Sequence, residues 1–326
     1  MPEKPKILVT RTLPEPAARM LAECGDVEWW TAKDFIPKAE IIRRLPQKHA
    51  LICLLTEPID EEVLNAAQEL KIVANIAVGF NNIDVAAATR RKIVVTNTPG
   101  VLDETTADLA FALLLAIARR LGEAERFLRA GRYKGWDLDL MLGVDVYQKT
   151  LGVVGFGRIG RAVAKRAQGF SMRVLYADEF RAPEEMEKSL NASRVGLETL
   201  LRESDFVSLH VPLLPGTRHL ISTRQLALMK PTACLINNSR GPVVDEAALA
   251  EALAAGRIRG AALDVFENEP AVHPTLLKLE NVVLVPHIGS ASVETRQKMA
   301  VMAVENVIAV LNGRRPANIV NPEVLG

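Results

Sequence analysis

The chain has 326 residues, of which 49% are hydrophobic and 24% are charged, and its net charge is only +1. This composition is typical of a globular protein of one or two domains, and the balanced charge argues against a nucleic-acid partner. The apolar runs are shorter than the roughly 18 residues that span a bilayer, and the opening MPEKPK lacks a signal region, so we expect a cytoplasmic protein without a membrane partner.

Short apolar runs rich in β-branched residues alternate with helical patterns in the first third of the chain. A helix is predicted over residues 61–69. Buried strands are predicted over residues 6–10, 50–55, 71–77 and 92–97. This alternation is typical of βαβ units in a parallel sheet.

The segment at residues 102–121, LDETTADLAFALLLAIARRL, predicts a helix. Thr105, Thr106 and Asp108 suit its opening turn. Because residues 110–118 are apolar on every face, we expect this helix to be buried all round, at a domain junction or a subunit interface.

A second alternating series begins near Lys149. Its helices are predicted over residues 158–169 and 245–255, and an amphipathic helix over residues 293–311 closes the series. Its strands are predicted over residues 150–155, 172–178, 206–210, 233–238, 260–265 and 282–285. A single sheet of ten or more strands is less common than two smaller sheets, so the pattern predicts an α/β protein with two domains.

The first strand of this series leads into the GxGxxG sequence of residues 155–160, GFGRIG. We expect Gly155 to permit a tight turn, Gly157 to leave room for a pyrophosphate, and Gly160 to let the helix pack closely on its strand. A GxGxxG sequence alone is a weak signal. Here strand, loop, helix and second strand follow in order, which favours dinucleotide binding over a glycine turn without a ligand.

The second strand of the unit ends at Asp178, 18 residues after Gly160. A carboxylate there can accept hydrogen bonds from the adenine ribose hydroxyls and would repel a 2′-phosphate. The sequence therefore predicts NAD as the cofactor, with NADH preferred over NADPH, although Arg181 lies close enough to weaken that preference.

Three chemically apt residues follow three different strands of the second series. Arg240, Glu269 and His287 come after the strands at residues 233–238, 260–265 and 282–285, and ligands of parallel sheets bind at the carboxyl ends of strands. Reduction of a 2-oxo acid needs a proton donor, a cation for the carboxylate and a group that controls the donor. The other histidines have structural explanations, and His210 fits a buried, hydrogen-bonded core position.

Several motifs, in order, make the chain resemble the D-isomer-specific 2-hydroxyacid dehydrogenases over nearly its whole length. These are VGFNNID (78–84), NTP (97–99), TAD (106–108), the glycine loop, NSRG (238–241), DVF (264–266) with Glu269 and Pro270, and PHIG (286–289). Within that family the VGFNNID loop, residues 136–147 and KRAQGF (165–170) look most similar to glyoxylate/hydroxypyruvate reductases.

The resemblance implies a role for each site residue. Arg240 would hold the substrate carboxylate and oxo group, Glu269 would orient the His287 ring, and His287 would protonate the substrate oxygen. Backbone N–H groups of Val78 and Gly79 would bind the carboxylate, and Leu55 would line the pocket. No metal is implied. The implied cofactor-binding residues are Gly155, Gly157, Arg158, Ile159, Gly160, Asp178, Val211, Pro212, Thr217, Thr106, Asn238, Ser239, Asp264 and Gly289.

The resemblance also implies an architecture of two Rossmann-like domains with parallel sheets. An NAD-binding domain, residues 100–288, would be inserted into a discontinuous substrate domain made of residues 1–99 and 289–326. The implied ligand is a small 2-oxo or 2-hydroxy acid, and the helix at 102–121 with an arm at 135–147 would support a homodimer.

Two alternatives stay open at this stage. The substrate could be another D-2-hydroxy acid, such as phosphoglycerate or the acid related to 2-ketogluconate, or phosphite, although VGFNNID offers no additional cation for a phosphate. The chain could also be an NAD-sensing binding protein without catalytic activity.

Overall fold

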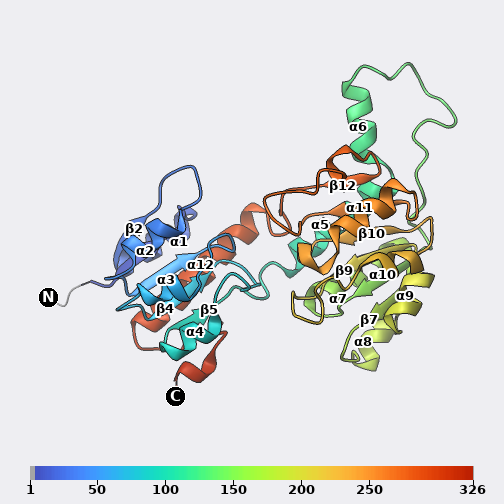
Figure 1. Cartoon of the computed structure of the whole chain (residues 1–326). Helices are drawn as coiled ribbons and strands as arrows, with labels where there is room; N and C mark the ends of the chain where they lie inside the picture. Colours follow the sequence, from blue (N-terminus) through green and yellow to red (C-terminus); the bar gives the residue numbers. More distant parts are fainter. Residues whose placement is uncertain (1–3, 326) are drawn as a thin grey trace. The chain divides into compact units, whose positions relative to one another are not determined.

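The chain divides into two compact units in the computed structural model, which describes residues 4–325 (Figure 1). The first unit joins the chain up to Leu102 with the part from Ala291 onward, and the second is Asp103–Ser290. Each unit contains one wholly parallel sheet, which confirms the predicted α/β class with two Rossmann-like sheets. Within residues 4–325, none of the helices combines the length and the apolar character needed to cross a bilayer.

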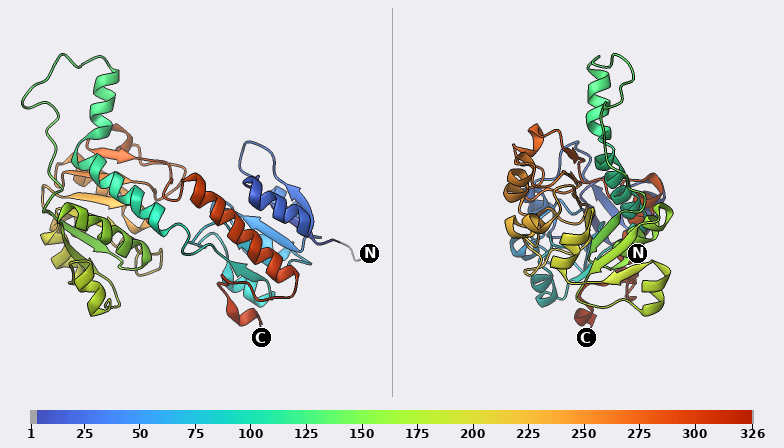
Figure 2. Two further views of the ribbon diagram at one scale, coloured as in Figure 1. Left: turned by 180° about the vertical axis from the view of Figure 1, so that it is seen from behind. Right: turned by 90° about the vertical axis from the view of Figure 1, so that its right-hand side faces the viewer.

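The first unit holds a five-stranded sheet in the order β2-β1-β3-β4-β5. Its strands are β1 (Lys6–Val9), β2 (Asp26–Trp29), β3 (Ala50–Cys53), β4 (Ile72–Asn75) and β5 (Val94–Thr96). Its helices are α1 (Glu15–Cys24), α2 (Lys38–Arg44), α3 (Glu61–Asn65), α4 (Val85–Arg90) and α12 (Val293–Leu311). The last helix matches its predicted bounds and packs against α1 and the central strands (Figure 2).

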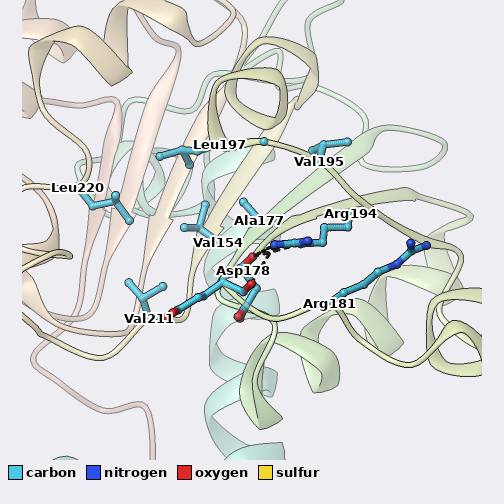
Figure 3. Close-up of a pocket in the computed structure, with 11 residues that line it drawn as sticks. Val154, Ala177, Asp178, Arg181, Arg194, Val195, Leu197, Val211 and Leu220 are labelled. Carbon is cyan, nitrogen blue, oxygen red and sulfur yellow. Dashed lines mark hydrogen bonds between the residues drawn. The ribbon is translucent and has the colours of Figure 1, made fainter.

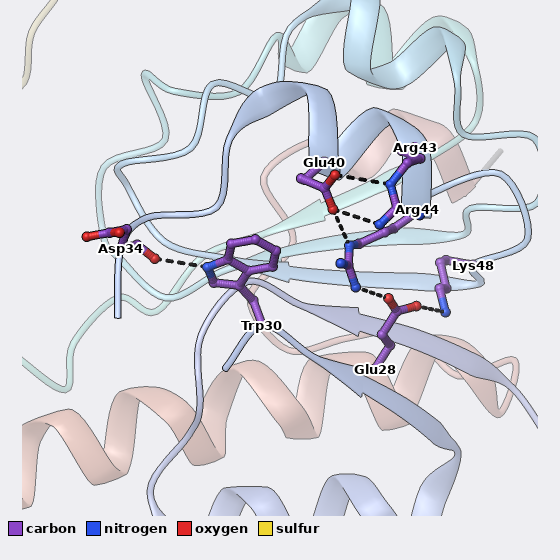
Figure 4. Close-up of polar contacts among 7 residues, drawn as sticks. All are labelled: Glu28, Trp30, Asp34, Glu40, Arg43, Arg44 and Lys48. Atoms are coloured by element: carbon purple, nitrogen blue, oxygen red, sulfur yellow. Dashed lines mark hydrogen bonds and ion pairs between the residues drawn. The ribbon is translucent and has the colours of Figure 1, made fainter. Parts of the chain in front are cut away.

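Strand β2 was not predicted, because its sequence DVEW is only four residues long and half of it is polar. It pairs with β1 at the edge of the sheet, and polar contacts tie it to helix α2 (Figure 4). Glu28 on β2 pairs with Arg44 and, at 2.6 Å, with Lys48. The Arg44 guanidinium also lies 5.2 Å from the centre of the Trp30 ring. These contacts compensate for the small apolar surface of the edge strand.

The second unit holds a seven-stranded sheet in the order β12-β11-β10-β9-β6-β7-β8. Its strands are β6 (Thr150–Val154), β7 (Arg173–Ala177), β8 (Ala192–Arg194), β9 (Phe206–Leu209), β10 (Cys234–Asn237), β11 (Gly260–Leu263) and β12 (Val282–Leu284). Its helices are α5 (Asp103–Ala118), α6 (Leu121–Arg129), α7 (Arg158–Ala167), α8 (Glu184–Ser189), α9 (Leu197–Glu203), α10 (Thr223–Leu228) and α11 (Glu246–Ala254).

Alternating side chains of the second sheet build two separate cores. On β10, Cys234 and Ile236 pack with helices α5 and α7, whereas Leu235 packs on the other face with α9, α10 and α11. Both faces are covered, as expected for a parallel sheet whose strands are apolar throughout. The carboxyl ends of the strands are therefore the part of this sheet that is left for ligands.

The predicted helix over residues 102–121 ends earlier than expected, and one of its faces is open in the single chain. It stops at Ala118, because Arg120 adopts a left-handed backbone with φ of 53° before α6 begins. Within the single chain Ala112 is exposed, so burial of the helix on every side would require a subunit interface and stays a prediction. The partly exposed side chains beside it are Leu109, Leu115 and Ala116.

Candidate active site

The strand order of the second sheet places a topological switch between β6 and β9. Connections leave these two neighbouring strands toward opposite sides of the sheet, which opens a crevice at their carboxyl ends. The loops after β6, β9, β10, β11 and β12 all emerge at this edge, because the strands are parallel. The glycine loop and all three candidate catalytic residues lie on these loops.

The glycine loop has the geometry that its sequence predicts. Gly155 has a φ of +89°, and a Cβ there would lie 2.7 Å from the His210 carbonyl oxygen. A Cβ on Gly160 would lie 2.1 Å from the Gly155 oxygen, so helix α7 packs too closely for a side chain. At Gly157, by contrast, a Cβ would meet nothing within 4 Å. The loop is therefore tight where the backbone turns and open beside the start of α7, which fits a pyrophosphate there.

Asp178 follows β7 and lines a pocket of about 640 Å³ with Val154, Arg181, Arg194 and Val211 (Figure 3). One carboxylate oxygen accepts a hydrogen bond of 2.6 Å from the Phe156 N–H, and the other accepts one from the Phe180 N–H. Asp178 thus fixes the glycine loop as well as lining the pocket. The residues present fit an adenosine half of a dinucleotide.

The two arginines of this pocket have partners other than Asp178's carboxylate. Arg181 forms two hydrogen bonds with Glu187, of 3.2 and 2.9 Å, and Tyr176 donates to the same carboxylate at 2.5 Å. Hydrogen bonds from Arg181 and Tyr176 lower the pKa of Glu187, so it stays ionised. Arg194 instead donates to the backbone oxygens of Asp178 and Glu179, each at 2.9 Å.

His287 and Glu269 form a hydrogen-bonded pair at the carboxyl edge. The distance from His287 Nδ1 to Glu269 Oε2 is 2.9 Å, and both side chains are about 30% exposed, at 27% and 32%. Burial raises the pKa of Glu269, but the hydrogen bond and charge of His287, with help from Arg240, outweigh it and place the pKa below its usual value. An ionised Glu269 fixes the ring so that Nε2 is left for a substrate.

Asp264 holds the loop that carries His287. Its two carboxylate oxygens accept the Ile288 N–H at 2.5 Å and the Gly289 N–H at 2.8 Å, while its carbonyl oxygen accepts the His287 N–H. His287 itself has a φ of 52°, an uncommon left-handed conformation. These three hydrogen bonds stabilise that conformation and fix the position of the backbone from which the imidazole projects.

Arg240 is positioned by the asparagine that ends β10. Asn237 donates to the Arg240 carbonyl at 3.0 Å and accepts from the Ser239 N–H and hydroxyl. A Cβ on the next residue, Gly241, would lie 1.8 Å from the Phe266 oxygen, so the loops after β10 and β11 touch. Burial lowers the pKa of Arg240 from its high usual value, whereas the nearby charge of Glu269 raises it.

The other predicted cofactor residues fall into two groups. Thr106, Asn238, Asp264 and Gly289 meet: Asn238 donates to the Thr106 carbonyl at 2.9 Å, and Gly289 abuts both Thr106 and Asp264. On the loop after β9, Val211 lines the Asp178 pocket, and the Thr217 hydroxyl donates to the Pro212 carbonyl at 2.6 Å. Arg158 and Ile159 open helix α7.

The predicted substrate residues of the first unit also follow strand ends. Leu55 comes after β3 and is 37% exposed. Val78 and Gly79 come after β4 and are half-buried. Leu55, Val78 and Gly79 belong to one unit, and Arg240, Glu269 and His287 belong to the other.

His210 has the structural role that was considered for it. It is half-buried, and its Nε2 lies 2.8 Å from the Ser208 hydroxyl. Burial lowers the pKa of His210 to about 3, so the ring is neutral. Cys53 and Cys234 are buried free thiols.

Several residues that shape the site were not anticipated. Arg194 lies on β8, whose sequence ASR gives no strand signal. Glu187 and Asn237 act through side-chain hydrogen bonds. A polar residue at the last position of an apolar strand, such as Asn237 or Asn75, is the one signal that could have identified some of them.

The glycine loop, the acidic pocket residue and the histidine–carboxylate pair at one sheet edge define a nicotinamide-dependent oxidoreductase. The model of the family "D-isomer specific 2-hydroxyacid dehydrogenase, NAD binding domain" matches residues 111–289. A glyoxylate reductase of Korarchaeum cryptofilum is 56% identical over 99% of this chain and 97% of its own length. The chain belongs to the D-isomer specific 2-hydroxyacid dehydrogenase family.

Solved structures agree with that assignment. A protein from Thermus thermophilus has a TM-score of 0.91 and 48% identity, covering 97% of this chain and 99% of its own. An NADPH-dependent glyoxylate/hydroxypyruvate reductase from Sinorhizobium meliloti has a TM-score of 0.85 and 34% identity, covering 97% of each chain. The chain is therefore an enzyme with an NAD-binding domain, as the resemblance implied, and relatives of known structure include an NADPH-dependent one.

Proposed function

We propose that the protein reduces a small 2-oxo acid of the glyoxylate or hydroxypyruvate type to the 2-hydroxy acid, with NADH as the preferred reductant. The observation that carries the proposal is the His287–Glu269 pair, which lies beside Arg240 at the same sheet edge as the glycine loop. When bound, the nicotinamide supplies a hydride to the oxo carbon. Every other requirement of the reaction falls to side chains and backbone groups of this chain.

His287 is the proposed general acid. Its Nδ1 is engaged by Glu269, so Nε2 is the atom that donates a proton to the oxygen as the oxo group becomes a hydroxyl. Glu269 orients the ring and stabilises the imidazolium before the transfer. Asp264 fixes the loop that carries His287, because its carboxylate accepts the Ile288 and Gly289 N–H groups.

Arg240 is the proposed partner of the substrate carboxylate and oxo group, because a guanidinium can engage two oxygens at once. Val78 and Gly79 would offer backbone N–H groups to the same carboxylate, with Leu55 at the pocket wall. In this proposal the first unit binds the substrate and Asp103–Ser290 binds the cofactor.

The preference for NADH rests on the pocket around Asp178. Its carboxylate would accept the ribose hydroxyls and repel a 2′-phosphate, and Arg181, the residue best suited to a phosphate, is paired with Glu187. Asp178→Ala should raise the efficiency with NADPH relative to NADH. A wild-type enzyme that already prefers NADPH would contradict this part of the proposal.

A homodimer is also proposed. The partly exposed face of α5 around Ala112 is apolar, and Trp136 and Leu138 on the following arm are 80% and 78% exposed. Apolar surface of this kind is typical of subunit interfaces. Sedimentation equilibrium would test the assembly, and a monomer at micromolar concentration would contradict it.

A cytoplasmic location stays a prediction.

The experiment that tests the function follows NADH and NADPH absorbance with glyoxylate, hydroxypyruvate, pyruvate and 2-ketogluconate, and in reverse with D-glycerate and phosphite. We expect rapid NADH oxidation with glyoxylate or hydroxypyruvate and D-glycerate as the product of the latter. Measurable NADH binding without turnover of any compound would contradict the proposal and favour an NAD-sensing binding protein.

A further inference from the structure

The loop after β4 has an unusual pattern of hydrogen bonds, in which three consecutive backbone carbonyls are held from behind. The Ala77 oxygen accepts the Thr98 N–H at 2.9 Å. The Val78 oxygen accepts Asn97 Nδ2 at 2.8 Å. The Gly79 oxygen accepts Asn75 Nδ2 at 2.9 Å. All of these groups lie in the first unit, at the carboxyl ends of β4 and β5.

A pinned carbonyl fixes the direction of the neighbouring N–H group. In a planar trans peptide the C=O of one residue and the N–H of the next point in opposite directions. The three bonds therefore direct the N–H groups of Val78, Gly79 and Phe80 away from the strand ends. In the chain from residue 4 to 325, these three N–H groups donate to no other residue.

Asn75 and its neighbour Asn82 are themselves held in one orientation. Asn75 is fully buried, with its Oδ1 facing the Cys53 thiol and its Nδ2 shared between the Gly79 carbonyl and Asn82 Oδ1, at 3.3 Å. Asn82 in turn donates to the carbonyls of Leu54 and Glu57, each at 3.0 Å. The network thus links the Leu55 segment to the Val78 loop and sets which end of each amide donates.

The chemistry of this arrangement suits an anion. A hydrogen bond to a carbonyl polarises the peptide and strengthens its N–H as a donor. Residues 76–83, IAVGFNNI, carry no cationic side chain, so no charged group of this loop competes with its backbone N–H groups for an anion. Uncharged asparagines orient those dipoles without competing for the anion, which an arginine or lysine would do.

We propose that Asn75 and Asn97 are positioning residues, which aim the Val78–Phe80 backbone amides at the carboxylate of the substrate. The inference rests on the proposed function, because it assumes that a 2-oxo acid carboxylate binds at this loop. Neither asparagine would touch the substrate. Their contribution is to hold the amides in the binding geometry before the substrate arrives.

The test compares Asn97→Ala and Asn75→Ala with the wild type and with Asn281→Ala. Asn281 is a matched control, because its Nδ2 also donates to two carbonyls, of Leu253 and Arg259, but in the second unit. The readouts are the KM and kcat for glyoxylate, inhibition by oxamate, the Kd of NADH, the melting temperature, and turnover of methylglyoxal, a 2-oxo compound without a carboxylate.

We expect the glyoxylate KM and the oxamate inhibition constant to rise roughly tenfold in both loop variants, because a weakened charged hydrogen bond costs on the order of one factor of ten. The NADH Kd and the efficiency with methylglyoxal should stay within about twofold. Equal losses with glyoxylate and methylglyoxal would overturn the inference, since they indicate a purely structural role.

Failure of the inference can be told apart from failure of the proposed function. An active wild type with loop variants of unchanged glyoxylate KM and oxamate inhibition overturns the inference alone. A wild type that neither reduces glyoxylate nor binds oxamate overturns the proposed function and this inference with it. Asn97 is only half-buried, so its variant carries the test if Asn75→Ala does not fold.

Discussion

The two units present candidate site groups of different kinds from sheets of the same kind. Both sheets are parallel, and in both the relevant residues follow strand ends. The second unit presents charged side chains, Arg240, Glu269 and His287, each on its own loop. The first unit presents the backbone around Gly79, held from behind by Asn75 and Asn97.

This difference matches the work that each unit is proposed to do. Proton transfer requires groups that change charge, and these are supported by further charged or hydrogen-bonding residues such as Asp264. Holding a carboxylate requires only fixed dipoles, which cost no reorganisation when the ligand binds. The following predictions test that division of labour.

The largest effect is expected at Arg240. Its replacement by alanine removes the guanidinium proposed to hold the substrate carboxylate, and it removes one of the two cationic groups that lower the pKa of Glu269, so kcat/KM for glyoxylate should fall roughly 10³-fold. Steady-state kinetics measure this loss. Arg240→Lys should retain part of the activity because it keeps the positive charge, and it should lose the rest because an ammonium lacks the two-pronged geometry of a guanidinium. A loss no larger than that of Asn97→Ala would erase the contrast between the two units.

A smaller loss is expected for Glu269→Gln, which keeps the shape but removes the charge that faces His287. We expect kcat/KM to fall about 100-fold. The pKa of Glu269 is lowered in the folded protein, so its stabilising contribution is present above the usual carboxyl pKa and is lost as pH falls through the lower, folded value. Acid unfolding below about pH 4.5 should therefore be less steep in the variant; an identical acid profile would contradict the pairing.

The preference between NADH and NADPH should also depend on Glu187. This residue has no direct contact with Asp178 and would act through its ion pair with Arg181. Glu187→Gln keeps an acceptor for Tyr176 but weakens the hold on Arg181. The ratio of efficiencies with NADPH and NADH should rise about tenfold, as expected for one new charged hydrogen bond to a phosphate. An unchanged ratio would show that the Arg181–Glu187 pair does not control the preference.

The last effect is on stability and not on activity, and it concerns acid unfolding of the second unit. Burial lowers the pKa of His210 to about 3. Between that value and the ordinary histidine pKa, the unfolded chain therefore binds a proton at His210 and the folded chain does not. Stability is then fully present above the ordinary histidine pKa of about 6.5 and falls toward pH 3, by at most about 1.4 kcal/mol per pH unit. His210→Gln should flatten this slope in urea unfolding at pH 7 and pH 5. A wild-type stability that does not change between these pH values would contradict it.

Much of the fold could be predicted because apolar strands and helix caps depend on residues that are close together in the sequence. Asp245 was expected to begin a helix, and its side chain does accept the Ala248 N–H. Edge strands β2 and β8 were missed, since segments of three or four residues that are at least half polar pair only because a neighbouring strand is there. Arg120 ended a helix through a left-handed backbone that no residue preference indicates.

The site could be predicted less evenly. Gly155 and Gly160 occupy positions where a Cβ would clash with the backbone. A requirement for glycine of this kind is visible directly in the sequence. The hydrogen bond from Asn97 to the Val78 carbonyl joins residues 19 apart in sequence, and that from Arg194 to the Asp178 carbonyl joins residues 16 apart. Such partners depend on strand register and on the direction of single side chains, which composition and periodicity do not determine.

The most direct test compares wild type and His287→Ala with glyoxylate at saturating NADH. We expect the variant to bind NADH with an unchanged Kd, measured by fluorescence titration, while kcat falls by about 100-fold or more, because the proton donor is lost and the cofactor site is intact. A variant that reduces glyoxylate at the wild-type rate would contradict the assignment of His287 as the acid.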